Sequence, residues 1–227
     1  MSKPDSVLRG ASLPKVWYTY EFKDAEEKTI TYRVQDVTPD LHQRLVEYYT
    51  TEFLNDETIC KHLKWTQDEV SLAEYLGLMK EALRGGYSLV VLEDAGNSDA
   101  TNDPEIVGAG MYMVKSGSEE ELLQGEGRSF RVLAAVIEAL KTHSSASTVE
   151  SMSGMGMWVR RDRRRRGIAE AIVRGAVASC RGKGVPHFSA FYTGTASQRA
   201  AAKAGLRVGT ALASTSSPSR RERLLTY

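Results

Sequence analysis

The chain has 227 residues, of which 41% are hydrophobic and 26% are charged, and its formal net charge is +1. This composition is typical of a globular protein, and the small net charge argues against a broad basic face for nucleic acid. The chain has no stretch of about 18 apolar residues, so no transmembrane helix is expected. The segment 1–6 lacks the apolar core of a signal peptide. The two cysteines and four histidines show neither disulfide nor zinc spacing, so we expect a cytoplasmic protein without a metal.

Residues 1–14 are expected to form a flexible leader, and residues 15–227 a single domain. Runs of apolar, aromatic and β-branched residues predict strands at 16–22, 29–34, 87–93, 106–114 and 186–192. A further strand ends at residue 159, another begins at residue 206, and a final edge strand is predicted at 223–227. Helical periodicity predicts helices at 38–53, 66–83, 130–143, 168–180 and 197–204. Because hairpins come first and strand–helix units last, we expect an α/β (α+β) fold. It should have a single mixed, mostly antiparallel sheet with helices on both faces.

Capping signals mark the starts of the first two helices. Thr38 followed by Pro39 is typical of a helix start. Thr66 and Glu69 have the spacing of a capping box. The segment 54–65 between these two helices is expected to be irregular.

A basic loop at residues 160–166 contains six arginines and follows the strand that ends at Val159. Gly167 comes next, and then a helix that begins at Ile168. The first N–H groups of a helix lack intrahelical partners and attract anions. Glycine lets the backbone approach a ligand closely, and arginines donate to phosphate oxygens. The loop is therefore expected to hold a pyrophosphate.

The spacing Arg164-x-x-Gly167-x-Ala169, after a strand ending in Val159, resembles the acyl-CoA-binding motif of the GNAT superfamily of N-acyltransferases. The resemblance covers roughly residues 29–227. It implies a GNAT fold, a CoA cleft between two splayed central strands, and acetyl-CoA as cosubstrate. The residues that it implies for CoA binding are Met157, Trp158, Val159, Arg164, Arg165, Arg166, Gly167, Ile168, Ala169 and Ser197. For Trp158, packing within the sheet is the alternative.

The segment 193–206 is similar to the second GNAT motif, with Ala204-Gly205-Leu206 in place of its Leu-Gly-Phe-like end. In many members a tyrosine of this helix protonates the departing thiolate, but Ala201 occupies that position here. The chain thus resembles the arthropod arylalkylamine N-acetyltransferases, which use hydroxyl residues instead. Those hydroxyls correspond to Thr193 and Ser197, although Ser197 also fits a helix N-cap.

The segment 53–63 resembles the aromatic helix end and Asp-Glu-Pro segment of the same arthropod enzymes, with Thr58 in place of the proline. In those enzymes the glutamate is the proposed general base, and Glu57 matches it. An ammonium cannot attack a thioester, so a carboxylate that attracts the cation and takes its proton fits the chemistry. A solvated loop residue is the alternative for Glu57.

Three residues are candidates for binding the amine. Phe53 matches an aromatic of the family's pocket, whereas Tyr75 and Met111 are looser candidates. Phe53 and Met111 also fit a role in the core.

The residues and the resemblance predict transfer of an acetyl or short acyl group from CoA to an arylalkylamine such as dopamine, tyramine or serotonin. The alternative enzyme is a GNAT protein that acts on polyamines, agmatine or amino acids. The alternative of another class is a non-catalytic CoA- or RNA-binding module. The expected partners are a small amine and acyl-CoA, without nucleic acid or membrane, and a monomer is favoured.

Overall fold

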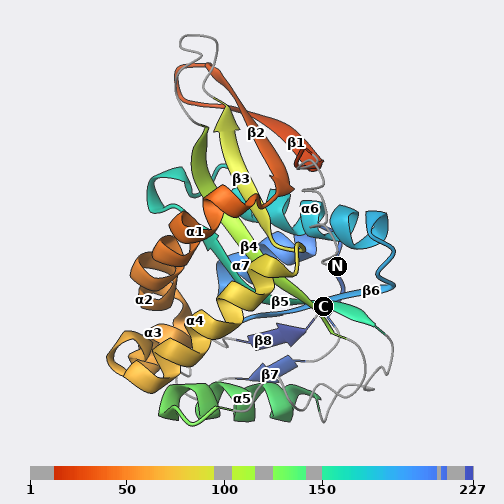
Figure 1. Ribbon diagram of the computed structural model, residues 1–227. Coiled ribbons are helices and arrows are strands. Elements are labelled where there is room, and N and C mark those ends of the chain that lie inside the picture. Colours follow the sequence, from red (N-terminus) through yellow and green to blue (C-terminus); the bar gives the residue numbers. More distant parts are fainter. Residues whose placement is uncertain are drawn as a thin grey trace, which may run out of the picture.

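The computed structural model describes residues 13–94, 104–115, 125–141, 150–208, 211–213 and 223–226 (Figure 1). Most of the predicted leader lies outside these residues. The strands are β1 Val16–Lys23, β2 Thr29–Asp36, β3 Leu89–Asp94, β4 Glu105–Lys115, β5 Ser151–Val159, β6 His187–Tyr192, β7 Ala211–Ala213 and β8 Arg223–Thr226. The α-helices are α1 His42–Tyr48, α2 Leu54–Asp56, α3 Thr58–Leu63, α4 Glu69–Arg84, α5 Arg128–Lys141, α6 Ile168–Gly182 and α7 Thr195–Lys203. Short 3-10 turns lie at Pro39–Leu41, Trp65–Gln67 and Arg161–Arg163, and a π-helical stretch lies at Tyr49–Phe53.

Among the described residues, eight strands form one sheet in the order β1-β2-β3-β4-β5-β6-β8-β7. In this sheet β5 and β6 run parallel, and the other neighbouring strands are antiparallel. The predicted mixed, mostly antiparallel sheet is therefore confirmed, as is the N-terminal hairpin of β1 and β2.

Helices cover both faces of the sheet, as the alternation along β3 makes clear. Val90 and Leu92 pack in one apolar core with α1 and α4, whereas Leu89 and Val91 pack in a second core with α6. Successive strand residues point to opposite faces, so the two cores lie on opposite sides. Figure 1 shows α4 in front of the sheet and α6 behind it. In the part of the chain that the structure describes, no helix combines the length and the apolar character that crossing a bilayer requires.

Two predictions about the N-terminal half were wrong in detail. The segment 54–65, expected to be irregular, is mostly helical because it contains α2 and α3. The cap of α4 is Asp68 rather than Thr66, since the Asp68 carboxylate accepts from the Ser71 amide at 3.2 Å. Thr66 instead lies in the preceding 3-10 turn.

Three predictions about the C-terminal part also need correction. Helix α7 begins at Thr195 with Gly194 as its N-cap, so Ser197 lies inside the first turn. Residues 206–208 are not in a strand. The final strand β8 is not at the edge, because the short β7 pairs with its outer side. A propensity pattern identifies a strand but carries no information about which neighbour covers it.

Candidate active site

The central strands β5 and β6 separate halfway along their length. They pair from Ser151 with His187 to Gly154 with Ala190, and no farther. Both strands continue, β5 to Val159 and β6 to Tyr192. Over this stretch β5 pairs only with β4 among the described strands, so its other edge offers free backbone groups toward β6.

The loop after β5 has the backbone of an anion site. Arg165 has φ of 65° and Gly167 has φ of 86°, so two left-handed residues lie on either side of Arg166. Gly167 is the N-cap of α6 and has no side chain with which to cap it. Turns that contain left-handed residues gather N–H groups into concavities that bind anions, and the helix dipole adds to the attraction. Ile168 is buried in the core below, and Ala169 is half-buried.

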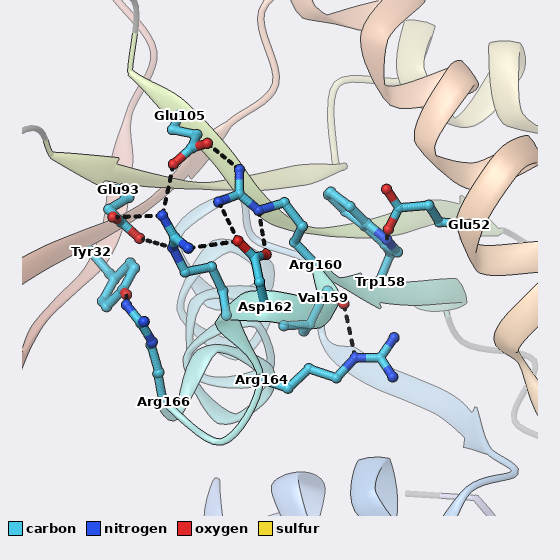
Figure 2. Close-up of polar contacts among 11 residues, drawn as sticks. Tyr32, Glu52, Glu93, Glu105, Trp158, Val159, Arg160, Asp162, Arg164 and Arg166 are labelled. Carbon is cyan, nitrogen blue, oxygen red and sulfur yellow. Dashed lines mark hydrogen bonds and ion pairs between the residues drawn. The ribbon is translucent and has the colours of Figure 1, made fainter. Parts of the chain in front are cut away.

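Most of the arginines in this loop are bonded within the protein (Figure 2). Arg160 and Arg163 both pair with Glu105 and Asp162, and Arg163 also pairs with Glu93 at 2.7 Å. Hydrogen bonds from Arg160 lower the pKa of the Glu105 and Asp162 carboxyls. These two arginines therefore hold the loop to β3 and β4, which is a structural task.

The three arginines of the predicted CoA motif have different surroundings. Arg164 donates to the Val159 carbonyl at 3.2 Å and pairs with Asp56 at 2.7 Å. Arg166 donates to the Tyr32 hydroxyl at 3.1 Å. Arg165 is exposed, and its guanidinium has no carboxylate partner among the described residues.

Glu57 and Thr193, both predicted to be catalytic, are hydrogen-bonded to each other. The Thr193 hydroxyl donates to Oε1 of Glu57 through a short contact, and the Cys60 amide donates to Oε2 at 2.8 Å. Glu57 is the N-cap of α3 and is half-buried. Burial, and then the Glu57 charge, raise the pKa of the Cys60 thiol, so this thiol stays protonated beside the carboxylate. The carboxylate thus lies across the end of β6, from which Thr193 follows.

Ser197 lies close to this pair but is bonded elsewhere. Its hydroxyl donates to the Gly194 carbonyl at 2.8 Å. A Cβ placed on Gly194 would lie 3.7 Å from both the Ser197 and the Thr58 hydroxyl oxygens. The two predicted hydroxyl residues and Thr58 therefore surround one glycine at the start of α7.

The three predicted amine-binding residues belong to one apolar core. Phe53 packs on β5 at Gly156, where an added Cβ would come within 2.8 Å of the ring. Met111 is the β4 partner of Gly156. Tyr75, on α4, is also buried, and its hydroxyl has no hydrogen-bond partner in the described part of the chain. Phe53 and Met111 thus both lie beside Gly156, just beyond the point where the strands separate, and all three predicted residues are buried.

Of the β5 residues predicted to bind CoA, Trp158 has its side chain in the core. Its ring stacks on Tyr48 at 4.6 Å, and its indole N–H donates to Glu52 at 3.0 Å (Figure 2). If Trp158 contacts a ligand between β5 and β6, it would therefore do so through its backbone. Met157 and Val159 are half-buried on the opposite face.

Several residues near these groups had no role in the sequence analysis. Asp56 forms ion pairs with Arg161 and Arg164 of the basic loop. It is the neighbour of Glu57, but the sequence analysis gave a role only to Glu57. Thr58 occupies the position of the family's proline. Tyr20 contacts the loop before α6 from β1, and no local pattern could have revealed a contact between residues so distant in the sequence.

Of the comparisons with known proteins, the one with solved structures identifies the fold. No protein-family model matches the chain, and no curated protein matches it. A structure from the mosquito Aedes aegypti that carries the name arylalkylamine N-acetyltransferase 7 is 23% identical, covers 97% of each chain and has a TM-score of 0.81. Arylalkylamine N-acetyltransferase 2 of the same species is 14% identical, covers 86% of this chain and 98% of its own, and has a TM-score of 0.68.

A polyamine N-acetyltransferase of Drosophila melanogaster, which forms N-acetylagmatine, is 16% identical. The match covers 86% of this chain and 97% of that one, with a TM-score of 0.59. At such identities the likeness concerns the fold. By this likeness the chain has the GNAT fold.

Proposed function

We propose that this protein transfers an acetyl or another short acyl group from acyl-CoA to the primary amine of a small molecule. The observation that carries the proposal is the hydrogen bond between Glu57 and Thr193. It joins a carboxylate suited to be a general base to a hydroxyl at the end of β6, one of the two strands that separate. The fold of the N-acetyltransferases named above supports the same activity.

The residues present fit acyl-CoA in two respects. The left-handed Arg165 and Gly167, followed by the uncapped first turn of α6, offer N–H groups to a pyrophosphate. The free edge of β5 from Met155 to Val159 offers backbone groups to the amides of the pantetheine arm. Exposed Arg165 is free to approach a phosphate, and Arg164 would do so by exchanging its bond with Asp56.

Glu57 would act on the amine before and during the attack. It attracts the ammonium and accepts one proton, which then passes to water. The free amine nitrogen attacks the thioester carbonyl carbon, a C–N bond forms and the C–S bond breaks. The second nitrogen proton is passed on to the departing sulfur, and we propose the hydroxyls of Thr193 and Ser197 as the groups that relay it, each exchanging its present bond to do so. An ammonium and acetyl-CoA thus yield an amide, free CoA thiol and one proton.

An arylalkylamine is the substrate class that we favour. The similar fold of the two arylalkylamine N-acetyltransferases supports this choice. Phe53 and Met111 lie in the apolar core beside β5 and are 8% and 1% exposed. Dopamine, tyramine and serotonin belong to this class. Polyamines and agmatine form the second class, supported by the similar fold of an agmatine N-acetyltransferase, which is 18% identical with a TM-score of 0.63. We further propose that the protein is cytoplasmic and monomeric and requires no metal.

The test is thiol release from acetyl-CoA with a panel of amines: tyramine, dopamine, serotonin, agmatine, spermidine and several amino acids. We expect release that depends on amine, with the highest kcat/KM for an arylalkylamine. Highest activity with agmatine or spermidine would favour the second class. Retention on immobilised CoA that free CoA competes, without turnover of any amine, would instead indicate a non-catalytic CoA-binding module.

A further inference from the structure

The N-terminal strand β1 contacts the loop before α6 through Tyr20. Its hydroxyl donates to the Arg166 carbonyl at 3.1 Å. Its ring lies beside Gly167, so that a Cβ on this glycine would be 3.5 Å from Cε2. Because β1 precedes the part of the chain that resembles GNAT proteins, the resemblance does not include this contact.

We propose that Tyr20 is a positioning residue for acyl-CoA, because it aims the Gly167 N–H group at the pyrophosphate. This inference rests on the proposed function. A trans peptide is planar, and its C=O and N–H groups point in opposite directions. The bond from Tyr20 to the Arg166 carbonyl therefore turns the N–H of the same peptide, which belongs to Gly167, away from β1.

The surroundings of Tyr20 keep its hydroxyl protonated, so that it remains a hydrogen-bond donor. Burial raises the pKa of its hydroxyl, and the neighbouring Tyr32 and Tyr18 hydroxyls act in the same direction, while Arg166 opposes them. Glu170 also faces it and raises the pKa. The hydroxyl consequently stays protonated throughout any practical assay range.

Arg166 is held at both ends by the same tyrosine pair. Its guanidinium donates to the Tyr32 hydroxyl (Figure 2). Its carbonyl accepts from Tyr20, whose ring stacks on that of Tyr32 at 5.2 Å. The guanidinium also lies 5.5 Å from the Phe22 ring centre. Arg166 therefore belongs to the support of the loop, and the peptide that follows it is fixed by that support.

The experiment compares two acyl donors in wild-type protein and Tyr20→Phe. Acetyl-CoA carries the pyrophosphate, whereas S-acetylpantetheine lacks it. The loss of one hydrogen bond should raise the KM for acetyl-CoA about three- to ten-fold with kcat unchanged. The kcat/KM for S-acetylpantetheine should not change. Tyr20→Leu, which also removes the ring from Gly167, should raise the acetyl-CoA KM further.

Tyr18→Phe is the matched control, since its ring stacks on Tyr20 at 6.1 Å on the same strand and it should behave as wild type. An unchanged acetyl-CoA KM in Tyr20→Phe would overturn the inference. So would an equal loss with both donors, because it would mean that Tyr20 supports the fold in general. A wild-type protein that neither binds nor uses acetyl-CoA would refute the proposed function itself.

Discussion

At the scale of single residues, Glu57 has its two carboxylate oxygens bonded to different parts of the chain. Oε2 caps α3, and Oε1 accepts from Thr193. A helix cap and the proposed general base thus coexist in one side chain. A substitution that keeps the acceptor but removes the base can separate the two tasks.

Glu57→Gln should lower kcat/KM roughly 100-fold at pH 7. The loss should shrink as the pH rises, because more of the amine is then free without a base. Glu52→Gln is the control, since Glu52 is a nearby carboxylate that accepts from the Trp158 indole. A defect in Glu57→Gln that is the same at every pH would assign the base to another group.

Thr193→Val removes the donor to Glu57 while keeping the shape of the side chain. We expect kcat to fall roughly 10-fold with little change in the acetyl-CoA KM, because a hydrogen bond to a charged acceptor is lost. Thr193→Ser should restore most of the activity. Steady-state kinetics of the three proteins test this, and a failure of serine to rescue would argue against a role for the hydroxyl.

Ser197→Ala should likewise lower kcat more than it changes the affinity for CoA. Its hydroxyl donates to Gly194 in the first turn of α7 and is not the helix cap. If Ser197→Ala turns over at the wild-type rate, the hydroxyl has only this local structural bond.

At the scale of elements, the loop before α6 depends on the left-handed conformation of Gly167. Gly167→Ala should raise the acetyl-CoA KM roughly 10-fold, because an L-residue there is strained by about 1–2 kcal/mol and the loop relaxes. The cause is backbone strain, since space for the methyl group exists beside Tyr20. Gly77→Ala in α4 is the control: nothing lies within 4 Å of its Cβ position, so the protein should gain about 1 kcal/mol without a change in KM.

Asp68 connects the starts of two helices. Its carboxylate accepts from the amide and hydroxyl of Ser71 in α4, and from the Ser129 amide in α5 at 2.8 Å. These bonds, led by that from the Ser129 amide, hold the pKa of Asp68 well below its usual value. The stabilisation is therefore complete above the unfolded pKa and is lost as the pH falls toward the folded one.

Asp68→Ala should lower the urea midpoint at pH 7, and its difference from wild type should shrink below about pH 4. Asp40→Ala, at an exposed position outside this hydrogen-bond network, is the control. Urea unfolding followed at several pH values measures both. A constant difference for Asp68→Ala down to pH 2 would contradict the assignment.

At the scale of the whole molecule, the charges of the arginine loop are largely neutralised by Glu93, Glu105, Asp162 and Asp56. With a net charge of +1, the protein should lose affinity for CoA only gradually as salt rises, giving a shallow log–log slope. CoA is a small anion whose attraction is merely screened by salt, without the condensed counterions of a nucleic acid. RNA should not compete. Elution from immobilised CoA at increasing salt measures the slope, and displacement by RNA would indicate a nucleic-acid surface.

The sequence alone determined most of the strands and the longer helices, because these depend on periodicity and on residues within a few positions of one another. It also identified the loop that we propose to hold the pyrophosphate, since a strand, a basic turn, a glycine and a helix follow one another directly. The resemblance to a known motif added Glu57, Thr193 and Ser197 as candidates for catalysis.

Only the tertiary structure decided which of these groups meet. The contact between Glu57 and Thr193 joins residues 136 positions apart, and that between Tyr20 and Arg166 joins residues 146 positions apart. The cap of α4 went to Asp68 because its carboxylate also reaches Ser129 on another helix. Trp158 points into the core and Arg166 supports the loop, although the resemblance implied CoA binding for both. A local pattern records which residue types are present, but partners and facing directions follow from packing across the sheet.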